Sequence, residues 1–192
     1  MASSFSIRTR TNRERERVHH VGRLNRRLHA LCIVAAVFAS GPASADDGCD
    51  RFAWSVMQER EALTAPTIPV LPSGSSIEPA HVRAFKLGLR EPADANFVMP
   101  PERKPRIETW SGGVVHFPAP LRAGVYQLTL SDEAWVDVIQ DGRYARSVGS
   151  SGRSDCPGVR KSVRFDLGTQ PFVIQISGAT VDSISLVFGP AF

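Results

Sequence analysis

The stretch Val163–Phe188 reads VRFDLGTQPFVIQISGATVDSISLVF, and it decides the fold. Apolar side chains alternate with other residues in three successive runs within it: Val163, Phe165 and Leu167; Phe172, Ile174 and Ile176; Ile184, Leu186 and Phe188. Alternation with a period of two places every second side chain on one face of a β-strand. Three such runs at roughly ten-residue spacing predict neighbouring strands joined by short turns.

The same alternation continues toward the N-terminus. Further strands are predicted at Phe85–Leu89, Phe97–Met99, Gly113–Phe117, Tyr126–Leu130 and Val136–Val138. Asp141-Gly142 follows the last of these and favours a hairpin turn, because both residues tolerate positive φ. The sequence shows no βαβ alternation, internal repeat or sustained heptad. The predicted fold class is therefore mainly β, an antiparallel β-sandwich or jelly-roll-like domain.

One helix is expected before the strands. In Cys49–Leu63 (CDRFAWSVMQEREAL) the apolar residues fall on one face at helical spacing, with Asp46 and Asp47 able to cap its start. Pro66 would end it. Trp54 lies off the apolar stripe, which favours packing at the domain edge over a ligand contact. The following stretch, Ala65–Ala80, contains four prolines and reads as a linker.

The first 45 residues read as a signal peptide. An Arg-rich segment precedes the 13-residue apolar run Leu28–Ser40, and Ala43-Ser44-Ala45 is a small-x-small cleavage site. The apolar run is shorter than the roughly 20 residues of a membrane-spanning helix. An uncleaved anchor and a mitochondrial leader are the alternatives, and Cys32 is poorly placed for a lipid anchor. The expected location is periplasmic or secreted, with no transmembrane segment after cleavage.

The chain divides accordingly into a signal peptide (1–45), a helix with a Pro-rich linker (46–80) and a β-sandwich (81–192), the last two forming one globular unit. The basic character belongs to the leader, because residues 46–192 hold 15 Lys+Arg against 17 Asp+Glu. Residues 46–192 therefore lack the net positive charge that favours nucleic-acid binding. Cleavage leaves Cys49 and Cys156, and an even count in an exported chain favours a disulfide over two free thiols.

Two resemblances add to this picture. Ala123–Phe188, with AGVYQLTL, AWVDVIQDGR and PFVIQISG, resembles the small β-sandwich modules of the pre-peptidase C-terminal type found on secreted bacterial peptidases. This resemblance implies a fold, and a function only by analogy. The whole mature chain, with CDRFAWSV, PPERKPR and AWVDVIQDGRYARSVGSSGRSDCPGVRKSVRF, is similar to a family of uncharacterised exported proteobacterial proteins.

Members of that family sometimes carry the label homogentisate 1,2-dioxygenase, which implies a non-haem iron site. Such a site needs two histidines and a carboxylate. The mature chain offers only His81 and His116, in no paired motif, with an acid such as Glu108 to complete the set. The sequence also lacks a G-x-S-x-G elbow, a C-x-x-C pair and a zinc-ligand pattern. No cofactor, metal site or catalytic residue is therefore predicted.

Two groups of residues are candidates for ligand binding. Asp141–Ser162 contains arginines and glycine–serine pairs. The guanidinium groups of arginine and the backbone N–H groups of such pairs can converge on a bound anion. The candidates there are Arg143, Arg146, Ser150, Ser151, Arg153 and Arg160. The alternative is a solvated, disulfide-pinned loop whose arginines pair with Asp132, Asp137, Asp155 and Asp166.

The second group is aromatic. Trp135 is expected to point away from Val136 and Val138, and Trp110 lies in a Gly-rich loop, with Tyr144 beyond the hairpin. Exposed aromatic faces can hold sugars, although large side chains usually pack inside. The sequence thus predicts an exported, non-catalytic accessory or envelope-associated protein. The alternative is a module that binds an anionic or carbohydrate ligand, and the iron dioxygenase comes third. The partner is an unknown protein or a small anionic or sugar ligand of the periplasm.

Overall fold

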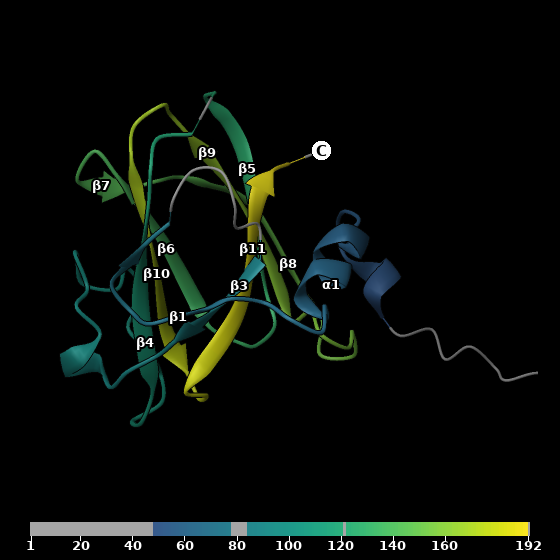
Figure 1. Ribbon diagram of the computed structural model, residues 1–192, viewed down its shortest axis with the longest axis horizontal. Helices are drawn as coiled ribbons and strands as arrows, with labels where there is room; N and C mark the ends of the chain where they lie inside the picture. The colour runs from purple at the N-terminus through teal and green to yellow at the C-terminus, as the bar shows by residue number, and fades with distance from the viewer. Residues whose placement is uncertain (1–47, 78–83, 121, 192) are drawn as a thin grey trace, which may run out of the picture. The chain divides into compact units, whose positions relative to one another are not determined.

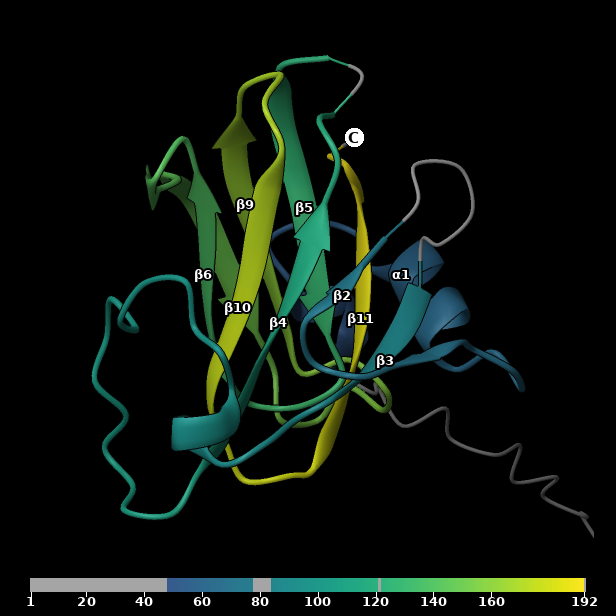
Figure 2. The same ribbon diagram turned by 60° about the vertical axis from the view of Figure 1, so that its left-hand side comes forward.

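The alternating apolar residues build two β-sheets that pack face to face (Figures 1 and 2). The computed structural model describes residues 48–77, 84–120 and 122–191, all within one compact unit. The predicted leader (1–45), the capping residues Asp46 and Asp47, and His81 lie outside the described residues. The predicted sandwich class is confirmed.

The larger sheet has six strands in the order β1-β3-β11-β5-β9-β8. Their bounds are β1 Val70–Leu71, β3 Ala84–Gly88, β11 Ser183–Pro190, β5 Gly124–Leu130, β9 Lys161–Leu167 and β8 Ser147–Gly152. The smaller sheet has five strands in the order β2-β4-β10-β6-β7. Their bounds are β2 Ser75–Ser76, β4 Ser111–Phe117, β10 Phe172–Ala179, β6 Trp135–Gln140 and β7 Arg143–Tyr144.

The main core lies between the two sheets. Each of the three runs that decided the fold supplies its alternate residues to this core: β9 through Phe165, β10 through Ile174 and β11 through Leu186. Aromatic rings fill one part of it, with Phe117 stacked on Phe172 at 4.8 Å and tilted against Phe188 at 5.0 Å between ring centroids. Burial of this apolar surface is the main source of stability for the sandwich.

A second, smaller core covers the outer face of the six-stranded sheet. It contains Phe52, Val56 and Leu63 from the N-terminal segment, the two cysteines, Val159, and Val187 of β11. The helix α1 (Met57–Leu63) lies against β11 and β3 (Figure 1). Val187 belongs here, while its neighbour Leu186 faces the sandwich, because consecutive strand residues point to opposite faces.

The predicted helix over Cys49–Leu63 is wrong in length. The segment forms a 3₁₀ turn η1 (Cys49–Arg51), an extended stretch, and then α1. Phe52 is extended, at φ −66° and ψ 153°. The extended stretch lets the Ala53 N–H donate to Ser151 Oγ at 3.0 Å and the Trp54 indole N–H donate to Ser162 Oγ at 3.0 Å. These tertiary bonds outweigh the helical periodicity, and Met57, expected on the buried face, is 70% exposed.

Three other predictions need correction. Phe97–Met99 is not a strand, because the backbone N–H groups of Val98 and Met99 donate to the side chain of Gln175 on β10. The Pro-rich linker contains β1 and β2, which pair in parallel with β3 and β4, so both sheets are mixed rather than purely antiparallel. The segment 141–162, expected as a loop, contains β7 and β8.

The Asp141-Gly142 turn is confirmed. Asp141 has φ 54° and Gly142 has φ 70°, which are the positive values that a two-residue hairpin turn requires at both positions. The turn joins β6 to β7, which pair only through Ile139–Tyr144 and Gln140–Arg143. Within the described ranges, no helix is long and apolar enough to cross a bilayer.

Candidate functional site

A groove at one edge of the sandwich is lined by strands of both sheets, β6 and β7 of the smaller sheet and β8 and β9 of the larger one. Because β7 pairs only with the last two residues of β6, Trp135–Asp137 of β6 have no strand partner on that side. The groove, which we call the edge groove, has a volume of about 450 Å³. It is lined by Glu102, Arg103, Trp135, Val136, Asp137, Val138, Tyr144, Ala145, Arg146, Ser147, Ser150, Lys161, Val163 and Phe165. This volume suits a small organic ligand.

The floor of the edge groove is apolar. Val136, Val138, Val163 and Phe165 line it, and the same residues belong to the buried core between the sheets. Their alternation along β6 and β9 turns them inward, so they meet where the two sheets approach each other. A ligand with an apolar body would remove this part of the floor from water.

Trp135 forms one wall, held by a hydrogen bond and by two cations. Its indole N–H donates to Asp137 Oδ1 at 2.7 Å. The Arg103 guanidinium carbon and Lys161 Nζ each lie 5.2 Å from the centroid of the Trp135 ring. Both distances are within the range of a cation–π interaction, so the indole and the two positive charges form one cluster.

Lys161 is half-buried in this cluster. Its ammonium donates to the Ala134 carbonyl at 2.8 Å, which uses one of three N–H groups. Burial lowers the pKa of Lys161; Glu133 opposes this shift, and Arg103 and Arg160 add to it. A negative group beside Lys161 would oppose that shift by favouring the charged amine.

Asp137 is the buried acid of the site, with only 3% of its surface exposed. Its Oδ2 accepts a hydrogen bond from the Glu102 backbone N–H at 3.1 Å, and its Oδ1 accepts the indole bond. Burial raises the pKa of Asp137, although both hydrogen bonds favour the carboxylate. Asp137 therefore anchors the loop that carries Glu102 and Arg103 to β6.

Tyr144 of β7 also lines the edge groove. Its hydroxyl donates to the Pro100 carbonyl. Burial and the nearby charges of Asp137 and Glu102 raise the pKa of the phenol, so it stays a neutral hydroxyl. Tyr144 and Asp137 thus both form hydrogen bonds to the backbone of the segment 100–102.

The charges of the edge groove are the feature that points to a ligand. The ion pairs found in the described part of the chain are Arg51–Asp155, Arg143–Asp141 and Arg160–Glu133. None of them contains Arg103, Arg146 or Lys161. Glu102 and Asp137 also line the groove, but among the described residues neither of them forms an ion pair with these three cations.

Only some of the sequence-predicted residues meet here. Trp135, Arg146 and Ser150 line the edge groove. Ser151 accepts a hydrogen bond from Ala53, Arg153 donates to the Arg51 carbonyl, and Arg160 pairs with Glu133 at 2.8 Å. Arg143 lies at the exposed hairpin beside Asp141, and Trp110 stacks on Phe97 at 6.0 Å.

Sequence reasoning missed Arg103, Lys161 and the apolar floor as parts of one site. The signal for Lys161 was its place next to Arg160 at the start of a strand that faces β6. No sequence pattern indicated Arg103, because the hydrogen bond from the Glu102 N–H to Asp137 is what brings the loop that carries Arg103 to the groove.

The predicted disulfide is present, with Cys49 and Cys156 joined at a Cα–Cα distance of 4.7 Å. Arg51 pairs with Asp155, and the Arg164 guanidinium lies 4.3 Å from the Trp54 ring centroid. We call the segment 48–56 and its partners in 151–164 the clip. Its contacts replace the pairing of arginines with Asp132, Asp137 and Asp166 that the alternative interpretation of this segment expected.

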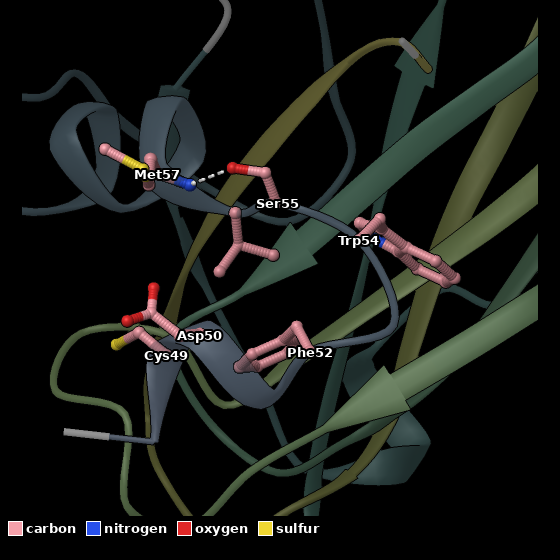
Figure 3. A pocket seen from close by; sticks show the side chains of 7 residues that line it. Cys49, Asp50, Phe52, Trp54, Ser55 and Met57 are labelled. Carbon is pink, nitrogen blue, oxygen red and sulfur yellow. Dashed lines mark hydrogen bonds between the residues drawn. The ribbon is translucent and has the colours of Figure 1, made fainter. Parts of the chain in front are cut away.

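A second hollow, of about 240 Å³, lies along the clip and is lined by residues 49, 50, 52 and 54–57. Its side chains do not converge: in Figure 3, Trp54 points away from Met57 and Cys49. It also lacks the cluster of cations found in the edge groove, which makes the edge groove the better candidate for a binding site.

His81, His116 and Glu108 were the candidates for the iron site implied by the dioxygenase label. His116 lies half-buried on β4, Glu108 is exposed in the loop before β4, and His81 is outside the described ranges. Among the residues described, no group of three His, Cys, Asp or Glu side chains is close enough to hold a metal ion.

Comparisons with known proteins add no name to this site. No family model, curated protein or solved structure matches the chain. The two resemblances drawn from the sequence stay predictions.

Proposed function

We propose that this chain is an exported, non-catalytic accessory protein whose edge groove binds a small organic anion with an apolar body. The observation that carries the proposal is the set of three cations, Arg103, Arg146 and Lys161, which surround an apolar floor without ion-pair partners in the described residues. Charged hydrogen bonds to a carboxylate would satisfy these cations. The core residues beneath would contact the apolar part.

The geometry favours an anion over a neutral sugar. Sugar-binding sites present a free aromatic face, whereas the Trp135 ring already has Arg103 and Lys161 within cation–π distance. Trp110, the other tryptophan considered for sugars, is stacked on Phe97 outside the groove. A carboxylate could instead take the spare donors of the same two cations while leaving the indole in place.

A benzoate titration followed by two-dimensional ¹H–¹⁵N NMR tests the proposal. Benzoate should bind saturably and shift the Trp135 indole N–H and the Ser150 amide. Benzyl alcohol, which keeps the ring and removes the charge, should bind much more weakly. Sulfate, which keeps charge and lacks the ring, should also bind more weakly.

Matched variants test which of the positively charged side chains bind the carboxylate of benzoate. Arg146→Gln and Lys161→Met should each weaken benzoate binding by about tenfold, since a charge-assisted hydrogen bond is worth roughly 1.5–3 kcal/mol. Arg143→Gln removes an arginine of the same hairpin that lies outside the groove, and it should leave binding unchanged. Absence of saturable shifts, or shifts confined to residues 52–57, would refute the proposed site.

The proposed location outside the cytoplasm rests on the predicted leader and on the disulfide, which forms in oxidising compartments. The N-terminus of the protein purified from its natural source should be Asp46. An intact Met1 on the functional protein would contradict export by cleavage.

A further inference from the structure

The six-stranded sheet ends in an edge strand that differs from the other three sheet edges. In the described sheets, the edge strands β1, β2 and β7 have two residues each, whereas β8 has six. An edge strand presents N–H and C=O groups that can pair with another chain, and short edges offer few of them. β8 is therefore the long edge of this sandwich.

β8 also carries little that would block pairing. Its sequence, SVGSSG, contains no charged residue and no proline, and Val148 is 47% exposed. A bulge between Ser147 and Gly149 interrupts the ladder with β9, but Gly149–Gly152 pair with it residue by residue. Bulges, charges and prolines are the usual protections of an edge, and only the first is present, at one end.

The clip covers one face of β8 and leaves the edge of this strand uncovered. Ala53 bonds the Ser151 side chain, and a Cβ on Gly149 would lie 3.2 Å from the Trp54 ring. Side chains stand perpendicular to a sheet, so these contacts reach β8 from above its plane. Among the described strands, only β9 lies in the plane beside β8.

The charge around β8 selects the partner. Asp141–Arg164 holds six basic residues and two acidic ones, and β8 lies between Arg146 and Arg153. Antiparallel pairing of two copies through β8 would place Arg146 of one near Arg153 of the other, which disfavours self-association. An extended chain with acidic side chains meets no such repulsion.

We propose that β8 is a strand-addition site for an extended acidic peptide segment of a partner protein. Main-chain hydrogen bonds to β8 supply affinity, and the exposed Arg146 at the start of β8 selects acidic side chains, because Arg153 at the other end already donates to the Arg51 carbonyl. This surface borders the edge groove, whose lining includes Arg146, Ser147 and Ser150. It uses the main-chain groups of β8 rather than the apolar floor of the groove, so peptide pairing and benzoate binding are tested separately.

The probe is a seven-residue synthetic peptide with alternating valine and glutamate, added to the full disulfide-bonded protein. Binding should slow amide hydrogen exchange at residues 147–152 and leave the Trp135 indole signal in place. The same peptide with lysine in place of glutamate should bind about tenfold more weakly or worse.

Two N-methylated peptides distinguish strand pairing from a general charge effect. One carries N-methyl groups on the valine amides and the other on the glutamate amides, so each blocks one edge of the extended peptide. One version should lose binding about tenfold or more, and the other should bind like the parent. Equal behaviour of the two versions would overturn the proposal, as would amide protection that leaves residues 147–152 unchanged. If the protein alone forms a concentration-dependent dimer in which residues 147–152 are protected, the partner of β8 is a second copy of this chain, and the peptide proposal is wrong.

Discussion

The clip and the edge groove draw on the same Arg-rich segment and use its charges in opposite ways. In the clip, Arg153 and Arg164 contact the N-terminal segment, and Arg51 reaches back to Asp155. In the edge groove, Arg146 and Lys161 form no ion pair among the described residues. A run of arginines in a sequence can therefore hold two parts of a fold together at one end and face a ligand at the other.

Removal of the disulfide should lower the free energy of unfolding more than any other change to the clip or the edge groove. Replacement of Cys49 and Cys156 by serine opens a covalent loop with a sequence separation of 107 residues, and it should lower the free energy of unfolding by about 4 kcal/mol. Urea unfolding followed by circular dichroism measures the loss. Benzoate binding to the fraction that stays folded should be unchanged, and a loss of binding in that fraction would show that the two regions are coupled.

Trp54→Ala should have the next largest effect. The indole packs over Gly149 and Arg164 and donates to Ser162, so its loss should lower the free energy of unfolding by about 2 kcal/mol. Trp54→Phe, which keeps a ring but not the N–H, should lie between the two proteins in urea unfolding. A Trp54→Ala protein as stable as the wild type would show that the clip is held by the disulfide alone.

The pH dependence of stability tests the anchor between the groove and its loop. Because burial raises the pKa of Asp137 above 3.8, the native state holds this proton more tightly than the unfolded chain. The contribution of Asp137 to stability is then fully present below about pH 3.8 and decreases as pH rises through the native pKa, by about 1.4 kcal/mol per unit of pKa difference. Unfolding free energies of the wild type minus Asp137→Asn should therefore fall with increasing pH in this window. A rise would mean that the two hydrogen bonds outweigh burial.

Arg146→Gln should have the smallest effect on stability. An exposed arginine without an ion-pair partner contributes little to folding, so the free energy of unfolding should change by less than about 0.5 kcal/mol. Arg160→Gln, which breaks the pair with Glu133, serves as the comparison and should cost up to about 1 kcal/mol. A larger loss from Arg146→Gln would identify an internal role for that side chain.

The sequence predicted the sandwich because its strands alternate, and the alternation depends only on local residue order. Val163–Phe188 and Tyr126–Leu130 form strands as expected. The helix failed because hydrogen bonds to Ser151 and Ser162 draw Ala53 and Trp54 into an extended path. Periodicity cannot report on partners about 100 residues away in the chain.

The site was predictable only in part for the same reason. Trp135 and Arg146 were identified by residue type, but Ser151 and Arg153 proved to hold the clip. The groove lies beside the part of β6 that β7 does not pair with, and it includes the loop bonded to Asp137. Neither feature follows from local pattern, since β7 comprises only two residues.

The most direct test of the division between clip and groove is an NMR experiment that detects contacts between bound benzoate and the protein. We expect nuclear Overhauser effects from the benzoate ring to the Trp135 indole and to the methyl groups of Val163, and none to Phe52 or Met57. Contacts to Phe52 and Met57 alone, or the absence of any contact at saturating benzoate, would contradict this expectation.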